Sequence, residues 1–318
     1  MPNIMDVLKT KIKDQDIKIV FPETKDPRII EAAIKLGKEG ILKPVLIGDP
    51  AEIDGDLSNC EVHNPNHSEL YNEFVQALVE RRSGKCSYEQ AEEMVKKPIY
   101  FGTMLVYMKY ASGLVAGAAQ STADTVRPAL QIIKTKPGIS KTFGYFLMVR
   151  EDEKYIMADC AINPMPNSHD LAEFAIESAK AAAMFDIDPK VALLSFSTNG
   201  SADTDETQKV RKAVKIAHKK APDLAIDGEM QFDTAFVPSV AKKKFSESKV
   251  AGYANTFIFP DLNSGNIGYK MVQRLGNFDA MGPILAGLNQ PVNDLSRGCS
   301  SQDVYNTAII TAAQSLMT

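Results

Sequence analysis

Short runs of apolar residues alternate along the chain with segments in which apolar residues recur every three or four positions. The run IKIVFPE (17–23) precedes the helical pattern PRIIEAAIKLGKEG (27–40), and KPVLIGD (43–49) follows it. The same alternation returns in ASGLVAG (111–117) and ADTVRPALQIIKTK (123–136). Such runs are typical of buried strands, and such spacing is typical of amphipathic helices. The alternation predicts parallel strands joined by crossover helices in an α/β fold.

The pattern changes near residue 142. The stretch KTFGYFLMVREDEKYIMADCAI (141–162) contains two strand-like runs joined by the charged turn EDEK, which predicts an antiparallel hairpin. Such a hairpin suits the start of a second domain. Strand and helix patterns then alternate again in DLAEFAIESAKAAAMFDI, KVALLSF, ETQKVRKAVKIAHKKA, LAIDGEM and TFIFPDL.

Length and composition agree with this organisation. The 318 residues are 44% hydrophobic and 24% charged, which suffices for a sizeable core and favours two domains. The formal net charge of -4 argues against a nucleic-acid partner, because nucleic-acid binding normally requires a basic surface. The expected protein is globular and acts on something other than DNA or RNA.

The spacing of the cysteines and the N-terminal sequence indicate the cellular compartment of the protein. The four cysteines, Cys60, Cys86, Cys160 and Cys299, form no C-x-x-C pair, so neither a disulfide framework nor a zinc site is indicated. The N-terminal segment MPNIMDVLKTKIKDQ is amphipathic and lacks the apolar core of a signal peptide. No apolar run approaches the roughly 20 residues of a membrane span. These features predict a cytoplasmic protein with no membrane partner.

The segment GLVAGAAQSTADTVRPAL (113–130) is the first candidate site. A strand ends in small residues and continues into a helix through Ser121 and Thr122. Small residues let a ligand approach the backbone, and a Ser/Thr helix start presents N–H groups and a positive dipole end, which suits phosphate. Arg127 would add a charge-assisted pair. The alternative is that the hydroxyls only cap a helix and Arg127 is a surface residue; the G-x-G-x-x-G and G-x-x-x-x-G-K-[ST] spacings are absent.

The segment FIFPDLNSGNIGYKMVQRL (257–275) is the second candidate. Here polar and small residues are expected to fill the gap between a buried strand and a helix. A tight strand-to-helix turn uses the same residue types, so a site is compatible with the segment but not required by it. The residues concerned are Asp261, Asn263, Ser264, Gly265 and Asn266.

The segment NDLSRGCSSQDVY (293–305) is the third candidate. It follows the apolar run AMGPILAGL and precedes helical spacing in DVYNTAIITAAQSL, which predicts a loop between a strand and a helix. A hydroxyl, a guanidinium and a carboxylate occur close together in it. The alternative is that Ser300 or Ser301 caps the last helix, with Asp303 in its first turn and Arg297 solvated.

These segments have a wider resemblance. Six segments resemble the phosphate acetyltransferase (phosphotransacetylase) family in their amino-acid sequence and in their order along the chain. They are GLVAGAAQSTADTVRPALQIIKTKPG, DCAINPMP, LLSFSTNGS, DGEMQFDTAF, NTFIFPDLNSGNIGYK and PVNDLSRGCSSQD. The resemblance extends from KIVFPE to the last helix and therefore covers nearly the whole chain. Because several strings are long, it is far more specific than any single loop.

The resemblance implies two α/β domains with a cleft between them, with mostly parallel sheets flanked by helices, in a fold like that of isocitrate and isopropylmalate dehydrogenases. Residues 1–140 with 288–318 would form the first domain, and residues 141–287 the second. The implied reaction is acetyl-CoA + phosphate = CoA + acetyl phosphate, with coenzyme A as a substrate and no cofactor. NAD is not implied, since the nucleotide fingerprint is absent. A homodimer is expected from the same likeness.

The resemblance also assigns roles to residues. Asp303 matches the base that deprotonates the CoA thiol. Such a base is useful because a thiol with a pKa of about 8.5 is mostly protonated at neutral pH. Ser296 matches a residue that orients the thiol, and Arg297 one that binds the phosphoryl group, which a guanidinium grips through two oxygens. Arg127 and Arg81 match further arginines of the site. The sequence VERRSGK around Arg81 differs from the usual sequence of the family at this place, so Arg82 is an alternative to Arg81. Ser121, Thr122, Asn263, Ser264 and Gly265 complete the expected binding residues.

Two mechanisms and three functions stay open at this point. Direct transfer in a ternary complex is favoured over an acetylated Cys299, because the spacing supplies no histidine partner for that thiol. The loop position of Cys299 beside Arg297 and a helix start would by itself lower the pKa of the thiol. A phosphate butyryltransferase and a non-catalytic protein that binds CoA or phosphate are the alternative functions.

Overall fold

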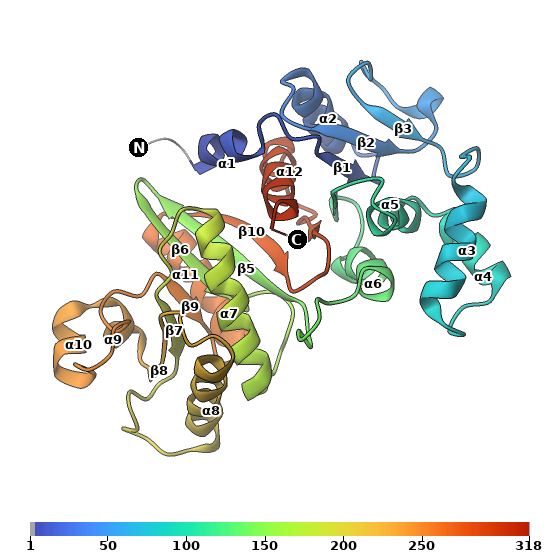
Figure 1. The fold of residues 1–318 in the computed structure, drawn as a ribbon. Coiled ribbons are helices and arrows are strands. Elements are labelled where there is room, and N and C mark those ends of the chain that lie inside the picture. Colours follow the sequence, from blue (N-terminus) through green and yellow to red (C-terminus); the bar gives the residue numbers. More distant parts are fainter. Residues whose placement is uncertain (1–3, 318) are drawn as a thin grey trace. The chain divides into compact units, whose positions relative to one another are not determined.

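The structure is a computed structural model that describes residues 4–317. It divides into two compact units: the first comprises the described part of residues 2–137 and 288–318, and the second comprises residues 138–287. Each unit has its own β-sheet with helices packed on it (Figure 1). The expected α/β class with mostly parallel strands is confirmed.

The first unit contains a five-stranded, fully parallel sheet in the order β11-β4-β1-β2-β3. The short apolar runs of the sequence form its central strands, and all four residues of β4 are buried. Successive residues of a strand face opposite sides of the sheet. The strands are β1 (Lys18–Phe21), β2 (Lys43–Ile47), β3 (Glu61–His63), β4 (Gly113–Ala116) and β11 (Val292–Asp294).

Helices cover both faces of this sheet. On one face Gly113 of β4 packs against Thr311 of α12, and on the other Leu114 packs against Gly102 of α5. The helix α12 also packs on α1 and α2, whereas α5 packs on α6 (Figure 1). The helices are α1 (Ile4–Ile12), α2 (Pro27–Lys38), α3 (Tyr71–Arg82), α4 (Tyr88–Val95), α5 (Pro98–Tyr107), α6 (Thr122–Ile132), α12 (Ser301–Ser315) and the 3-10 turn η1 (Pro50–Glu52).

The second unit contains a mixed six-stranded sheet in the order β10-β5-β6-β9-β7-β8. The predicted hairpin is confirmed: β5 and β6 pair antiparallel, with a turn at Glu151 and Asp152. The pairs from β6 to β8 are parallel. The strands are β5 (Phe143–Arg150), β6 (Glu153–Ala158), β7 (Val191–Leu194), β8 (Ile226–Met230), β9 (Thr256–Ile258) and β10 (Asp279–Ala286).

Five helices accompany this sheet within the described residues. The helix α7 is buried along most of its length, and α8 packs beside it with an amphipathic pattern. They are α7 (Ser168–Met184), α8 (Asp205–Lys220), α9 (Phe232–Phe236), α10 (Pro238–Lys244) and α11 (Leu262–Gly276). Across residues 4–317, no helix is both long enough and apolar enough to traverse a bilayer.

Two expectations about local structure are wrong. The run AMGPILAGL is not the strand that leads into the 293–305 segment, since it forms most of β10 in the second unit. That strand is β11, which includes Asn293 and Asp294, and the predicted order of strand, loop and helix in the segment is confirmed by β11 and α12. The polar residues after β9 do not form a loop, because Asp261 caps α11 and the helix begins at Leu262. Asn263, Ser264 and Gly265 therefore lie in the first turns of that helix.

Candidate functional site

The candidate site lies at the edge of the first sheet where the parallel strands end. The loops after β1, β4 and β11 leave from this edge, and Leu295 N donates to the Ala116 carbonyl at 2.7 Å. The strand order reverses between β1 and β4, since β2 and β3 lie on one side of β1 and β4 on the other. In open α/β sheets ligands bind outside the carboxyl ends of strands at such a reversal. Function is therefore expected at these three loops.

Arg28 joins the three loops through all five N–H groups of its guanidinium. Nε and Nη2 grip the carboxylate of Asp26, at 3.0 and 2.6 Å. Nη2 also donates to the carbonyl of Ala118 at 2.9 Å, and Nη1 donates to the carbonyls of Arg297 and Cys299 at 2.9 and 2.7 Å. The hydrogen bond from Arg28 lowers the pKa of Asp26, which keeps this pair charged. One planar cation thus fixes backbone that is distant in sequence.

The 295–303 segment leaves β11 and begins α12. Ser296 and Arg297 are exposed, and among the described residues the Arg297 guanidinium makes no hydrogen bond or ion pair. Ser300 is the N-cap of α12, and its N and Oγ both donate to Oδ2 of Asp303 at 2.8 Å in a capping box. The capping alternative is therefore the observed arrangement. It leaves Oδ1 of Asp303 with no donor from the part of the chain that the structure describes.

The loop before α6 differs from the expected phosphate cradle. The backbone N–H groups of Gly117, Ala118, Ala119 and Gln120 all donate to the carboxylate of Glu23, at 2.8 to 3.1 Å. These N–H groups are consequently occupied by a side chain of the protein itself. The groups left for an anion are those of the helix start, where the first N–H groups lack intrahelical acceptors.

At the start of α6, Ser121 is the N-cap and accepts from Asp124 N, while its own Oγ donates to the Asp124 carboxylate at 2.6 Å. Arg127 lies one turn further, and its side chain is 60% exposed. Its one ion pair among the described residues is a loose contact of 3.9 Å with Asp124. The structure therefore brings Ser121, Thr122 and Arg127 to the same sheet edge as Ser296, with Arg127 open to solvent.

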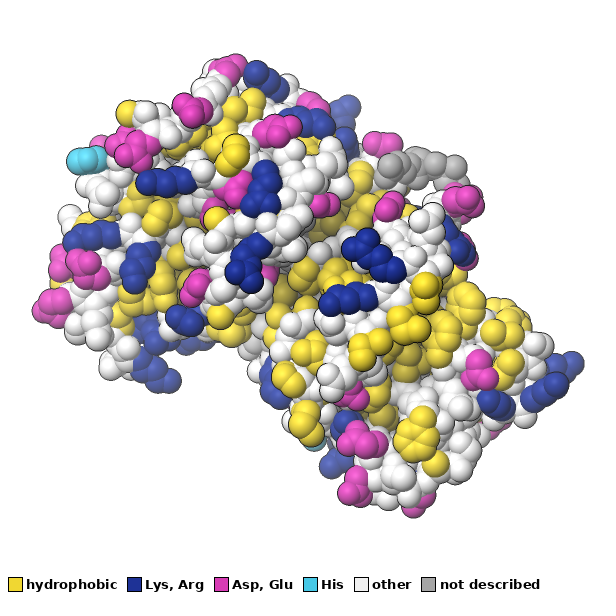
Figure 2. All heavy atoms as spheres, turned by 180° about the vertical axis from the view of Figure 1, so that it is seen from behind, with side chains coloured by type: hydrophobic (Ala, Val, Ile, Leu, Met, Phe, Trp, Pro, Cys, Tyr) yellow, Lys and Arg dark blue, Asp and Glu magenta, His cyan; other side chains and the backbone are white. Residues whose placement is uncertain are grey.

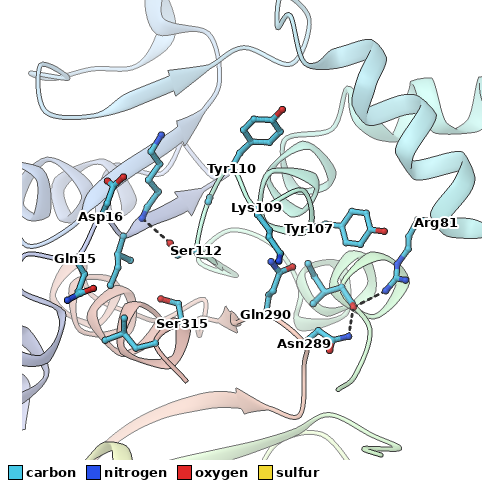
Figure 3. A pocket seen from close by; sticks show the side chains of 15 residues that line it. Gln15, Asp16, Arg81, Tyr107, Lys109, Tyr110, Ser112, Asn289, Gln290 and Ser315 are labelled. Carbon is cyan, nitrogen blue, oxygen red and sulfur yellow. Dashed lines mark hydrogen bonds between the residues drawn. The ribbon is translucent and has the colours of Figure 1, made fainter. Parts of the chain in front are cut away.

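Arg81 lies at the opposite edge of the sheet. Its guanidinium donates to the carbonyls of Ile132 and Ile133, at the C-terminal end of α6, and stacks on Tyr107. It lines a cavity of about 920 Å³ at the N-terminal ends of the strands. Figure 3 shows Arg81 among the other side chains of this cavity. The length of α6 separates this position from Ser121 by roughly 15 Å. The structure thus does not bring Arg81 to the other candidate residues.

Arg82, the alternative, has a buried Nε that makes no hydrogen bond among the described residues. Burial raises the pKa of Tyr100, and the charges of Arg127 and Arg82 oppose that rise, so both guanidinium groups lie near its hydroxyl. Tyr100 itself donates to Gln131 of α6 at 3.0 Å. Of the two arginines, Arg82 is the one on the side of Arg127.

Two buried acidic residues of this edge are not among the site residues predicted from the sequence. Glu23 is 6% exposed and lies two residues beyond the end of β1, and Asp294 is 4% exposed and is the last residue of the buried strand β11. Burial raises the pKa of Asp294, and nearby Glu23 adds to the rise, whereas the hydroxyls of Thr122 and Thr125 lower it. A polar residue at the carboxyl end of a buried parallel strand is the pattern that could have identified both.

Cys299 does not have the environment expected from its loop position. The thiol is buried, and desolvation raises its pKa; Arg28 opposes the rise, and the carboxylates of Asp303 and Asp26 add to it. The expectation of a lowered pKa is wrong because burial and acidic neighbours outweigh the cation. A thiol in this state is a poor nucleophile at neutral pH.

The candidate residues of the second unit have structural roles within that unit. Ser264 N donates to Asp261 Oδ1 at 2.8 Å as part of the cap of α11. A side chain at Gly265 would collide with the carbonyl oxygen of Asp159, so the helix passes this backbone too closely for any other residue. Asn263 is exposed. These contacts account for Ser264 and Gly265 without a ligand.

Known proteins resemble this chain over its full length. The phosphate acetyltransferase of Bacillus subtilis is 58% identical over 323 residues, covering 99% of this chain and all of that protein. Among solved structures, a phosphotransacetylase from Streptococcus pyogenes has 53% identity and a TM-score of 0.96, covering 99% of this chain and 98% of that chain. The EutD phosphotransacetylase from Staphylococcus aureus has 55% identity and a TM-score of 0.94, with 98% of each chain covered.

More distant likeness concerns the fold alone. A putative 4-hydroxythreonine-4-phosphate dehydrogenase from Salmonella typhimurium shares 15% identity at a TM-score of 0.54, which agrees with the expected dehydrogenase-like architecture. The family described as Phosphate acetyl/butaryl transferase matches residues 3–312. With relatives above half identity along its whole length, this chain belongs to the phosphate acetyl/butaryl transferase family.

Proposed function

We propose that this chain is a phosphate acetyltransferase, which transfers acetyl reversibly between coenzyme A and inorganic phosphate. The observation that carries the proposal is the clustering of Ser296, Arg297 and Asp303 in one segment whose backbone Arg28 holds against the loops after β1 and β4. Full-length relatives that carry this name favour acetyl over butyryl. Coenzyme A is a substrate in this reaction, and no resident cofactor is needed.

The proposed mechanism is direct attack of the CoA thiolate on acetyl phosphate within a ternary complex. Oδ1 of Asp303 takes the thiol proton, while the two Ser300 hydrogen bonds on Oδ2 keep the carboxylate oriented. Ser296 orients the thiol and stabilises the developing anion, and Arg297 and Arg127 bind the phosphoryl oxygens. The C–O bond to phosphate breaks as the C–S bond forms, and phosphate leaves. Holding both reactants together supplies several kcal/mol of the barrier reduction.

A release assay tests the function itself. With acetyl-CoA and phosphate, we expect phosphate-dependent release of CoA thiol and formation of acetyl phosphate. A profile over acetyl-, propionyl- and butyryl-CoA should have its maximum of kcat/KM at acetyl. A maximum at butyryl-CoA would instead support a phosphate butyryltransferase. Tight binding of CoA with no thiol release would support a non-catalytic protein.

Replacement of Cys299 by alanine tests the covalent alternative. Because this thiol is buried and its pKa is raised, Cys299→Ala should keep kcat within about tenfold of the parent, which is about 1.4 kcal/mol of barrier. Initial velocities should form intersecting, sequential patterns. Ping-pong kinetics with a stoichiometric acetyl thioester on Cys299, formed and discharged at the rate of turnover, would establish the covalent route.

We also propose that the protein is a homodimer that pairs through the second unit. Three large apolar side chains at i, i+4 and i+8 on α11 are exposed, Leu275 to 81%, and Phe232 and Phe236 of α9 line an apolar pocket together with α11. Figure 2 shows hydrophobic side chains gathered on one face of the protein. Exposed patches of this kind mark protein interfaces. The α11 side chains are Ile267, Met271 and Leu275.

Sedimentation equilibrium tests this assembly. The parent should sediment at about twice the chain mass of 34.8 kDa, and Met271→Glu with Leu275→Glu should shift it to the monomer because two charges enter an apolar interface. Asp205→Asn, a charge change on an exposed position of α8, is the control and should stay dimeric. A monomeric parent at micromolar concentration would contradict the proposal.

We also propose that the protein is located in the cytoplasm, where its four free cysteines would stay reduced.

A further inference from the structure

Glu23 holds an unusual position for a buried acidic residue. It follows β1 after Pro22, is 6% exposed, and accepts four backbone hydrogen bonds from consecutive residues. Oε2 accepts from Gly117 and Ala118 at 2.8 and 2.9 Å, and Oε1 accepts from Ala119 and Gln120 at 3.1 and 3.0 Å. The carboxylate is thus bound by the whole loop that connects β4 to α6.

Successive backbone N–H groups that converge on one point form a concavity that binds anions, and such concavities often hold a phosphate. In this chain the bound anion is a side chain from the neighbouring strand. The loop needs a special backbone to achieve this, since Gly117 has φ +109° and a side chain there would collide with Asp294. On the carbonyl side the same loop is held by Arg28, through Ala118.

The loop determines where the helix start lies. Residue 120 is followed directly by Ser121, the N-cap of α6, and Arg127 lies in the next turns. The N-cap hydroxyl, the first-turn N–H groups and Arg127 can meet the phosphoryl group only if the loop keeps one conformation. No other described side chain accepts a hydrogen bond from the four N–H groups, so their placement depends on Glu23.

We propose that Glu23 is a positioning residue for acetyl transfer: its carboxylate fills the anion site of the 117–120 loop and thereby fixes the start of α6 against the 295–303 segment. The proposal rests on the proposed function, because it assigns turnover to that edge of the sheet. The phosphoryl group is then bound by arginine side chains and the start of α6. The loop N–H groups bind Glu23 instead of the phosphoryl group, and they affect its binding only because this contact fixes the start of α6.

Removal of the side chain and chemical rescue test this role. Glu23→Ala leaves a space with four unpaired N–H donors, so kcat should fall by about tenfold or more, since a misplacement of about 1 Å can cost about a hundredfold. Added formate, a free carboxylate, should restore most of the lost kcat with saturation. Formamide, which is neutral and of similar size, should not. The parent assayed at the same formate concentrations corrects for any inhibition.

Two further variants keep the test decisive. Glu23→Gln preserves side-chain size but turns an NH₂ group towards two N–H donors, so kcat should fall without any rescue by formate, because the space remains filled. Glu52→Gln removes an exposed carboxylate whose only ion pair among the described residues is with Lys25, and it should match the parent. The Glu23→Gln variant also covers the case in which Glu23→Ala does not fold.

Parent-like kcat in folded Glu23→Gln or Glu23→Ala would overturn the proposal, as would a lost kcat in folded Glu23→Ala that formate leaves unchanged. A parent protein without phosphate-dependent acetyl transfer would count against the proposed function instead. The two failures are therefore distinguished in the same assay.

Discussion

Asp303→Asn is expected to lower kcat by about a hundredfold or more, the range for loss of a general base. The variant keeps an oxygen that can accept from Ser300 N, so the N-terminal cap of α12 is largely preserved. What it loses is the ability to take the thiol proton at Oδ1. Binding of CoA should change little, because the carboxylate acts on the thiol only as the proton leaves. Steady-state kinetics in both directions, with binding of CoA by calorimetry, measure the two effects separately.

Loss of a charge at a helix start could lower stability on its own. We expect at most about 1 kcal/mol from the cap, measured by urea denaturation. Asp205→Asn is the matched control, since it removes an exposed carboxylate from the first turn of α8 and should keep parent kcat. If Asp303→Asn turns over at nearly the parent rate at neutral pH, Asp303 is not the base.

Arg297→Gln is expected to raise KM for acetyl phosphate by roughly 10- to 150-fold, since one charge-assisted pair contributes about 1.5–3 kcal/mol. The Arg297 side chain is exposed and has no partner among the described residues, so it is available for an anion. KM for CoA should rise far less. Arg127→Gln should act in the same direction, because its contact with Asp124 is loose.

Lys215→Gln is the control for net charge, as it removes an exposed cation from α8 and should leave both KM values unchanged. Equal increases in KM for acetyl phosphate and CoA would point to a general loss of structure, which circular dichroism would reveal. Equal increases in a folded protein would remove Arg297 from the phosphoryl site.

The hydrophobic pattern predicted the elements that are short, buried and apolar, or clearly amphipathic. The strands at 18–21 and 113–116 and the helix at 122–132 lie within or close to the expected ranges. Helix α5 gave no usable signal, because PIYFGTMLVY is apolar on all sides and shows no amphipathic period. The sequence predicts a turn at the start of α11, because Asn, Ser and Gly favour turns, whereas in the structure Asp261 caps the helix and these residues are helical.

The candidate site could be predicted only in part, for a physical reason. Ser296, Arg297 and Asp303 are neighbours in sequence, so one segment indicates all three. Arg28 and Glu23 act on backbone groups about 90 to 270 residues away, and backbone acceptors and donors leave no trace in residue identity. Arg81 is the opposite case: the sequence places it among the site residues, but its guanidinium binds the Ile132 carbonyl, and this contact depends on helix packing alone.

A crystal structure of Asp303→Asn with CoA and acetyl phosphate tests direct transfer at this edge of the sheet, because a variant without its base should retain both reactants. We expect both to be bound together, with the thiol about 3–3.5 Å from the acetyl carbon and the phosphoryl oxygens bound by Arg297. A phosphoryl group bound at Arg81 on the opposite edge of the sheet, or an acetyl group on Cys299, would contradict this expectation.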